Sequence, residues 1–251
     1  MATLTDTRWI VVDTETTGID YEVEKLVEVT AIELVSLDSR EHHVLIDELI
    51  NPGIPIPAVA SAVHHLTEQH LAGKPSPEEV VARLRSRLDA IGADNYVLIA
   101  HNASFDQDFV ASVDPYFYEV RWFDTRRMAK HLWPEAPKHS NQVLRYHLEL
   151  NVDTGPLSPH RALADVMVTA ELFRRECAAY RLCNDFIDDA DAMIEFIERP
   201  LVVTTMTFGK HRGERLDEIP NSYIRWALDN IADLDFDLKW SLEQQLNNGA
   251  L

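Results

Sequence analysis

One apolar run that ends in two acids constrains this chain more than any other feature. Residues 9–12, Trp-Ile-Val-Val, lead directly into Asp13 and Glu15, and Gly18 follows as a turn residue. The run is typical of a buried strand, in which side chains two apart share a face, so both carboxylates point the same way. The two carboxylates repel each other unless a divalent cation neutralises them, so the motif predicts a cation site. The alternative interpretation is a solvated acidic turn at the end of a strand.

The periodicity of the remaining apolar residues predicts an α/β domain with a mixed five-stranded sheet flanked by helices. Short connections between the first three strands indicate an antiparallel meander. Ser76 and Glu79 form a capping box at the start of one helix. The expected strands cover residues 9–12, 24–35, 43–50, 96–100 and 120–123, and the expected helices cover 77–91, 103–113, 125–132, 140–148 and 159–181.

The C-terminal part of the chain has a different texture. We expect a domain over 1–182, an acidic connector over 183–199 that reads as a solvated helix, and a small α+β module over 200–251. In the module, the pattern predicts a strand over 202–208, a glycine-bounded basic turn over 209–213 and two helices.

Composition excludes several classes of protein. The net charge of −19 argues against a sheath that coats long nucleic acid, although local binding through bridging cations stays open. The two cysteines, Cys177 and Cys183, lack the spacing of a zinc site or a disulfide scaffold, which favours a reducing cytoplasm. The polar N-terminus shows no signal-peptide pattern, and no apolar run reaches the length of a membrane span.

Two further motifs supply acids near the same place. Asp106 follows a short apolar strand, and His160 with Asp165 frames the start of the last long helix, where Pro159 favours a loop position for His160. Ligands collect at the carboxyl ends of strands in α/β sheets, so these groups are expected to converge with Asp13 and Glu15. Four carboxylates suit two magnesium or manganese ions, and a nearby histidine can accept a proton from water.

Together the three motifs resemble those of the DEDDh 3′–5′ exonucleases. The motifs are Asp13-Thr14-Glu15-Thr16-Thr17-Gly18, His101-Asn102-Ala103-Ser104-Phe105-Asp106 and His160-Arg161-Ala162-Leu163-Ala164-Asp165, with no signature residue substituted. Residues 63–68, 130–134, 207–213 and 223–226 extend the likeness over nearly the whole chain. The resemblance implies a ribonuclease-H-like fold and hydrolysis of phosphodiester bonds.

By this resemblance, Asp13, Glu15, Asp106 and Asp165 hold two Mg²⁺ ions, with Mn²⁺ as a substitute, and His160 is the general base. The implied partner is a DNA 3′ end, single-stranded or duplex, and no membrane. The candidate substrate contacts are Thr14, Thr16, His64, Asn102, Phe105, Lys210 and Arg212. RNA as the substrate remains an alternative, as does an idle module that binds nucleic-acid ends or a repair partner. Packing or surface roles are the alternatives for the substrate contacts.

Overall fold

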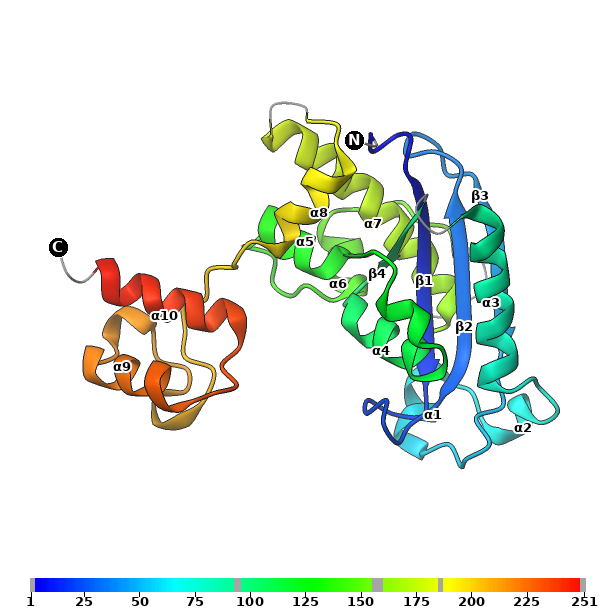
Figure 1. Cartoon of the computed structure of the whole chain (residues 1–251), viewed down its shortest axis with the longest axis horizontal. Coiled ribbons are helices and arrows are strands. Elements are labelled where there is room, and N and C mark those ends of the chain that lie inside the picture. Colours follow the sequence, from blue (N-terminus) through cyan, green and yellow to red (C-terminus); the bar gives the residue numbers. More distant parts are fainter. Residues whose placement is uncertain (1–2, 93–95, 155–159, 185–186, 249–251) are drawn as a thin grey trace. The chain divides into compact units, whose positions relative to one another are not determined.

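The computed structural model describes residues 3–92, 96–154, 160–184 and 187–248. The chain folds as two compact units, Met1–Ile197 and Glu198–Leu251. The first unit contains a five-stranded sheet with the strand order β3-β2-β1-β4-β5. Its strands are β1 (Arg8–Thr16), β2 (Leu26–Leu34), β3 (His42–Leu49), β4 (Tyr96–Ala100) and β5 (Trp122–Asp124), of which Figure 1 labels the first four.

The pairing of the strands confirms the expected mixed sheet. β1 pairs antiparallel with β2, and β2 pairs antiparallel with β3. On its other side β1 pairs parallel with β4, with Val11 opposite Ile99, and β4 pairs parallel with β5. β1 is therefore central, and it continues beyond the last residue that pairs with β4.

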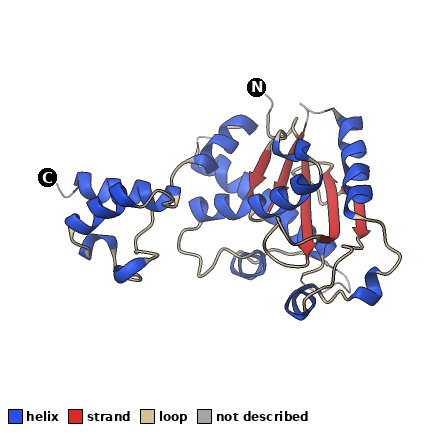
Figure 2. Ribbon diagram, turned by 60° about the horizontal axis from the view of Figure 1, so that its bottom comes forward, coloured by secondary structure: helices blue, strands red, loops and turns tan. Residues whose placement is uncertain are grey.

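Helices cover both faces of this sheet (Figure 2). In the first unit the structure describes α1 (Ala58–His64), α2 (Glu68–Leu71), α3 (Pro77–Ile91), α4 (Ala103–Val113), α5 (Thr125–Leu132), α6 (Asn141–His147), α7 (Ala162–Cys183) and α8 (Ala190–Glu198). The predicted capping box of Ser76 and Glu79 is present at the start of α3. None of the helices in the described ranges combines the length and the apolar character that a membrane span requires.

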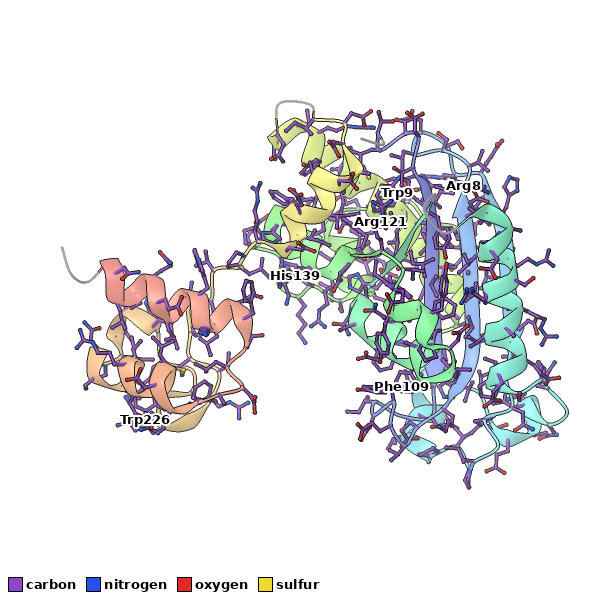
Figure 3. The ribbon with its side chains drawn as sticks, viewed as in Figure 1. Arg8, Trp9, Phe109, Arg121, His139 and Trp226 are labelled. Atoms are coloured by element: carbon purple, nitrogen blue, oxygen red, sulfur yellow. The ribbon has the colours of Figure 1, made fainter. Side chains whose placement is uncertain are left out.

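Alternation along β1 builds two separate core clusters. Trp9 and Val11 pack with α7 on one face, whereas Ile10 and Val12 pack with α3 and α4 on the other. Figure 3 labels Trp9 and Phe109, one from each cluster. In the first cluster the ring of Phe173 lies 4.7 Å from that of Trp9 and 5.2 Å from that of Phe123. This aromatic contact fixes α7 on the sheet.

The segment expected to be a solvated connector behaves differently. Its described part forms α8, in which Ala190, Met193 and Ile197 are buried in the first core cluster. The three residues follow helical spacing, so one face of the helix is apolar while its acids lie on the other. The high proportion of acids in this segment predicted a solvated helix, although the apolar residues between the acids follow helical spacing. The boundary between the two units accordingly lies at Ile197.

The second unit is helical rather than α+β. It contains α9 (Asn221–Asn230) and α10 (Phe236–Asn248), with short 3₁₀ turns at Gly209–His211 and Leu216–Glu218. The strand expected over 202–208 is reduced to one isolated antiparallel bridge between Thr205 and Arg215. Met206, Leu216, Ile219, Ile224, Leu238 and Leu242 form the buried core. Among the described residues, only Arg215 pairs with this segment, so no strand forms over residues 202–208.

The aromatic contact in the first cluster generates a prediction about stability. Phe173 is fully buried, so Phe173→Ala should lower the free energy of unfolding by about 3–5 kcal/mol through lost burial and a residual cavity. Leu182→Ala is the matched control, because Leu182 lies on the same helix but is 70% exposed. Denaturant unfolding measures both changes. Equal losses in the two variants would contradict the assignment of this core.

Candidate active site

Asp13 and Glu15 lie on the face of the sheet that α7 covers. The alternation that directs Trp9 and Val11 to this face continues to both acids. Across the antiparallel pair, Asp13 is opposite Thr30 and Glu15 is opposite Glu28. The carboxyl end of β1 thus presents its two carboxylates toward the beginning of α7.

Asp106 reaches the same place from the other face of the sheet. It lies in the first turn of α4 and is 4% exposed. Its Oδ1 accepts hydrogen bonds from the backbone N–H of Thr14 at 2.9 Å and from the Thr14 hydroxyl at 2.8 Å. Thr14, which was expected to border a substrate, therefore ties α4 to β1 between the two acids of that strand.

Asp165 and His160 come from the start of α7. His160 precedes the helix with φ of 63°, and its backbone N–H donates to Asp165 Oδ2 at 2.7 Å. Gln142 Nε2 donates to Asp165 Oδ1 at 3.1 Å. One ligand atom each of Glu15, His160 and Asp165 lies within 4.8 Å of the others. Pro159, expected at the start of this helix, lies outside the described residues.

Burial and mutual repulsion oppose ionisation of this cluster. The pKa of Asp13 is raised well above its usual range, first by burial and then by Asp106, Glu15 and Asp165. Burial also raises the pKa of Glu15 to about 8 and that of Asp106 to about 7. Asp13 Oδ2 is buried without a hydrogen-bond partner among the described residues. An unpaired carboxylate oxygen amid other carboxylates fits a hard divalent cation such as Mg²⁺ or Mn²⁺.

An ion pair next to the cluster, with a buried glutamate and a half-buried arginine, was missed in the sequence. Glu28 is 2% exposed and accepts from Arg161 Nη2 at 2.7 Å, from Arg161 Nε at 3.1 Å and from the Ala162 N–H at 3.1 Å. The pair joins β2 to the residue after His160, so it holds the loop against the sheet. The available signal was an acid inside the apolar run of residues 26–29.

The remaining expected contacts in the first unit have defined surroundings. Thr16 is buried and donates its hydroxyl hydrogen to the Gly18 carbonyl. His64 is 1% exposed, burial lowers its pKa, and its Nδ1 accepts from the Leu66 N–H at 3.0 Å. The half-buried Phe105 ring lies 4.9 Å from that of Phe109. Packing therefore accounts for part of the environment of these side chains.

The loop between β4 and α4 is held by its own polar contacts. Asn102 has φ of 80°, its N–H donates to Asp124 Oδ1 at 3.1 Å, and its Oδ1 accepts from Arg126 Nη1 at 3.1 Å. His101 contacts the Thr125 hydroxyl and the His139 carbonyl, each at 2.9 Å. Burial lowers the pKa of His101 to about 4, so its ring is neutral near pH 7.

Lys210 and Arg212 belong to the second unit. Both are exposed on the turn that follows Phe208, and the glycines on either side have φ of 66° and 86°. The expected glycine-bounded turn is thus present, as the 3₁₀ turn Gly209–His211 and its continuation. The four acids of the motifs and His160, in contrast, lie together in the first unit.

The raised pKa values predict how pH changes the stability of the metal-free protein. A carboxyl whose pKa is higher in the folded than in the unfolded chain destabilises the folded protein as the pH rises from the unfolded-state pKa to the folded-state pKa. Between pH ~4.3, the ordinary pKa of a glutamate, and about 8, the pKa of Glu15, Glu15→Gln should therefore raise the melting temperature above wild type by an increasing margin. Thermal unfolding in a chelator measures this. A margin that stays constant or shrinks would contradict the assigned burial of the cluster.

The Glu28–Arg161 pair yields a second prediction. Arg161→Ala leaves a buried carboxylate without its counter-charge, which costs about 3–5 kcal/mol of folding free energy. Arg8→Ala is the control, because the arginine of its pair with Glu33 is 43% exposed, and we expect a loss of at most about 1 kcal/mol. Adding Glu28→Gln to Arg161→Ala should recover part of the stability. No recovery would show that charge is not the cause.

Comparison with known proteins places this geometry in a family. Residues 10–173 match the RNase T family model, described as exonuclease. Exodeoxyribonuclease 10 of Escherichia coli K12 is 32% identical over 242 residues, which cover 95% of this chain and 98% of that protein.

Two solved structures agree with the sequence comparison. Exonuclease X in complex with 5′-overhanging duplex DNA has a TM-score of 0.58 and 28% identity, and covers 75% of this chain and 99% of that one. Product-bound exonuclease I, at 15% identity and a TM-score of 0.56, covers 76% of this chain and 46% of that one, and shares the fold. The chain belongs to the RNase T family of exonucleases and is of the DEDDh type.

Proposed function

We propose that this chain is a metal-dependent 3′–5′ exodeoxyribonuclease that releases nucleoside 5′-monophosphates from DNA 3′ ends. The observation that carries the proposal is the convergence of Asp13, Glu15, Asp106 and Asp165, with His160 at the edge of the cluster. The names of the full-length relative and of the DNA-bound neighbour support DNA as the substrate.

The four acids would hold two Mg²⁺ ions, for which Mn²⁺ could substitute. Bound metal would lower the pKa of a water and neutralise charge that develops on the phosphate. His160 is exposed beside Glu15 and Asp165, so its ring can accept the proton of the attacking water. Water oxygen bonds to phosphorus, the bond to the 3′ oxygen breaks, and that oxygen takes up a proton.

The hydrogen bonds around the site would keep His160 and the acids in place during this step. The His160 N–H to Asp165 bond fixes the backbone of the base relative to one acid, and the Arg161–Glu28 pair fixes it relative to the sheet. Thr14 holds Asp106 through two donors. Preorganisation of this kind spares the cost of ordering the groups when substrate binds.

We assign the substrate contacts by position in the motifs. Thr14, Thr16 and the backbone that follows them would border the terminal nucleotide. His64 and Phe105 would contact its sugar or base, and Asn102 would lie near the phosphate. Lys210 and Arg212 would contact phosphates from the second unit.

The two free cysteines, buried Cys177 and exposed Cys183, support a cytoplasmic location.

The alternative with the same chemistry is a 3′–5′ exoribonuclease, because a single contact to the 2′-hydroxyl can decide the sugar. The other alternative is an idle module that binds nucleic-acid ends. Matched DNA and RNA oligonucleotides with labelled 5′ ends, incubated with Mg²⁺, separate these three functions. We expect DNA to shorten stepwise from its 3′ end and faster than RNA.

The same assay tests the residues. His160→Ala should slow DNA shortening by roughly 10²–10⁴-fold while DNA binding persists. Asp13→Ala should reduce the rate by at least as much without loss of fold, because removing one clustered acid relieves repulsion. Faster loss of RNA would favour the exoribonuclease. No degradation of either substrate by the wild type would leave only the end-binding module.

A further inference from the structure

The second unit carries a patch formed by the exposed Trp226, the half-buried Tyr223 and two exposed cations of one turn, Lys210 and Arg212. Tyr223 and Trp226 lie one turn apart on α9, with ring centroids 5.4 Å apart and planes inclined by 33°. Lys210 Nζ lies 5.0 Å from the centroid of the Tyr223 ring. Trp226 is 49% exposed, a large apolar surface left open to solvent (labelled in Figure 3).

The fold of this unit locks the basic turn onto the aromatic residues. A Cβ on Gly209 would lie 2.5 Å from the Tyr223 hydroxyl, and φ at Gly209 is 66°, so only glycine permits this approach. The His211 ring packs edge-on against Tyr223 at 4.5 Å. Ile224 and Ala227 on α9 are fully buried, which fixes the face that the helix presents. The patch is therefore rigidly built.

The charges of the patch are available to a ligand. Within the described part of the chain, Lys210 and Arg212 form no ion pair, and both are exposed. Their basic neighbours differ: Arg215 donates to both oxygens of Asp217 at 2.9 and 2.7 Å, and His211 contacts Glu214 at 2.8 Å. Two exposed cations on one turn, one of them over the Tyr223 ring, contrast with the net charge of −19 of the chain.

We propose that this patch binds an unpaired nucleic-acid strand, with a base stacked on Trp226 and phosphates on Lys210 and Arg212. Open aromatic rings beside cations bind single strands because every base offers a face and every nucleotide a charge. A base paired inside a duplex cannot stack in this way. The inference rests on the proposed function for its choice of nucleic acid and adds a binding surface outside the unit that holds the catalytic acids.

Binding by the full chain tests the patch without cleavage. In an Asp13→Asn background, anisotropy of a fluorescent 20-nucleotide thymidine strand gives the dissociation constant. Trp226→Ala should weaken binding roughly tenfold or more, whereas Trp226→Phe keeps a ring and should retain most of the affinity. Phe236→Ala is the matched control, an aromatic 57% exposed in the same unit, and should bind as the parent does.

Salt dependence tests the cations separately. Lys210→Ala with Arg212→Ala should lower the log–log slope of binding against salt by about 0.7 for each phosphate that is no longer neutralised. Arg215→Ala is the control, because Asp217 already neutralises that arginine, and its slope should equal that of the parent. An unchanged slope in the double variant would overturn the assignment of Lys210 and Arg212.

Two outcomes distinguish this inference from the proposed function. With the catalytic acids intact, Trp226→Ala should hydrolyse a dinucleotide at the wild-type rate, since no further nucleotide can reach the patch. If nothing is hydrolysed while the binding pattern holds, the proposed function fails and the patch stands. If DNA is degraded but Trp226→Ala binds the strand as tightly as the parent, the patch does not bind nucleic acid.

Discussion

The repulsion among the four carboxylates is the constraint on which the rest of the site depends. Burial raises the pKa of Asp13 most, and the neighbouring Asp106, Glu15 and Asp165 raise it further. A pKa of about 8 for Glu15 corresponds to several kcal/mol of opposition to its charged form. Such a cluster persists only because a well-packed scaffold forces the acids together, and its natural counterpart is a divalent cation.

The scaffold divides this task between the two faces of one strand. The alternation of β1 directs Asp13 and Glu15 toward α7 and turns Thr14 toward α4, where its two donors hold Asp106. On the α7 side, the backbone of His160 and the amide of Gln142 bind the two oxygens of Asp165. The nearby positive charge of Arg161 is already engaged by Glu28. Arg161 therefore offsets the negative charge of the cluster only in part.

The sequence sufficed to predict the sheet and the convergence of the motif residues, because both follow from local patterns. The apolar, largely β-branched residues 9–12 predict the first strand. The capping box of Ser76 and Glu79 predicts the helix that begins at residue 77. The Glu28–Arg161 pair could not be predicted, since it joins positions 133 residues apart through tertiary packing. The acids of α8 led to the prediction of a solvated helix, although one face of this helix is buried in the core. Residues 202–208 have the composition of a strand, but only Thr205 forms a β-bridge.

Because the pKa values of Asp13, Glu15 and Asp106 are raised, we expect divalent cations that bind the cluster to displace protons from these three acids. Calorimetric titration with Mn²⁺ at pH ~6.5, in two buffers of different ionisation enthalpy, counts the protons released on binding. The pKa values of Glu15 and Asp106 alone predict release of roughly one to two protons per protein, Asp13 adds to this number, and Glu15→Gln should release fewer. Binding without proton release would show that these acids are already ionised, and no binding at all would show that the cluster is not a cation site.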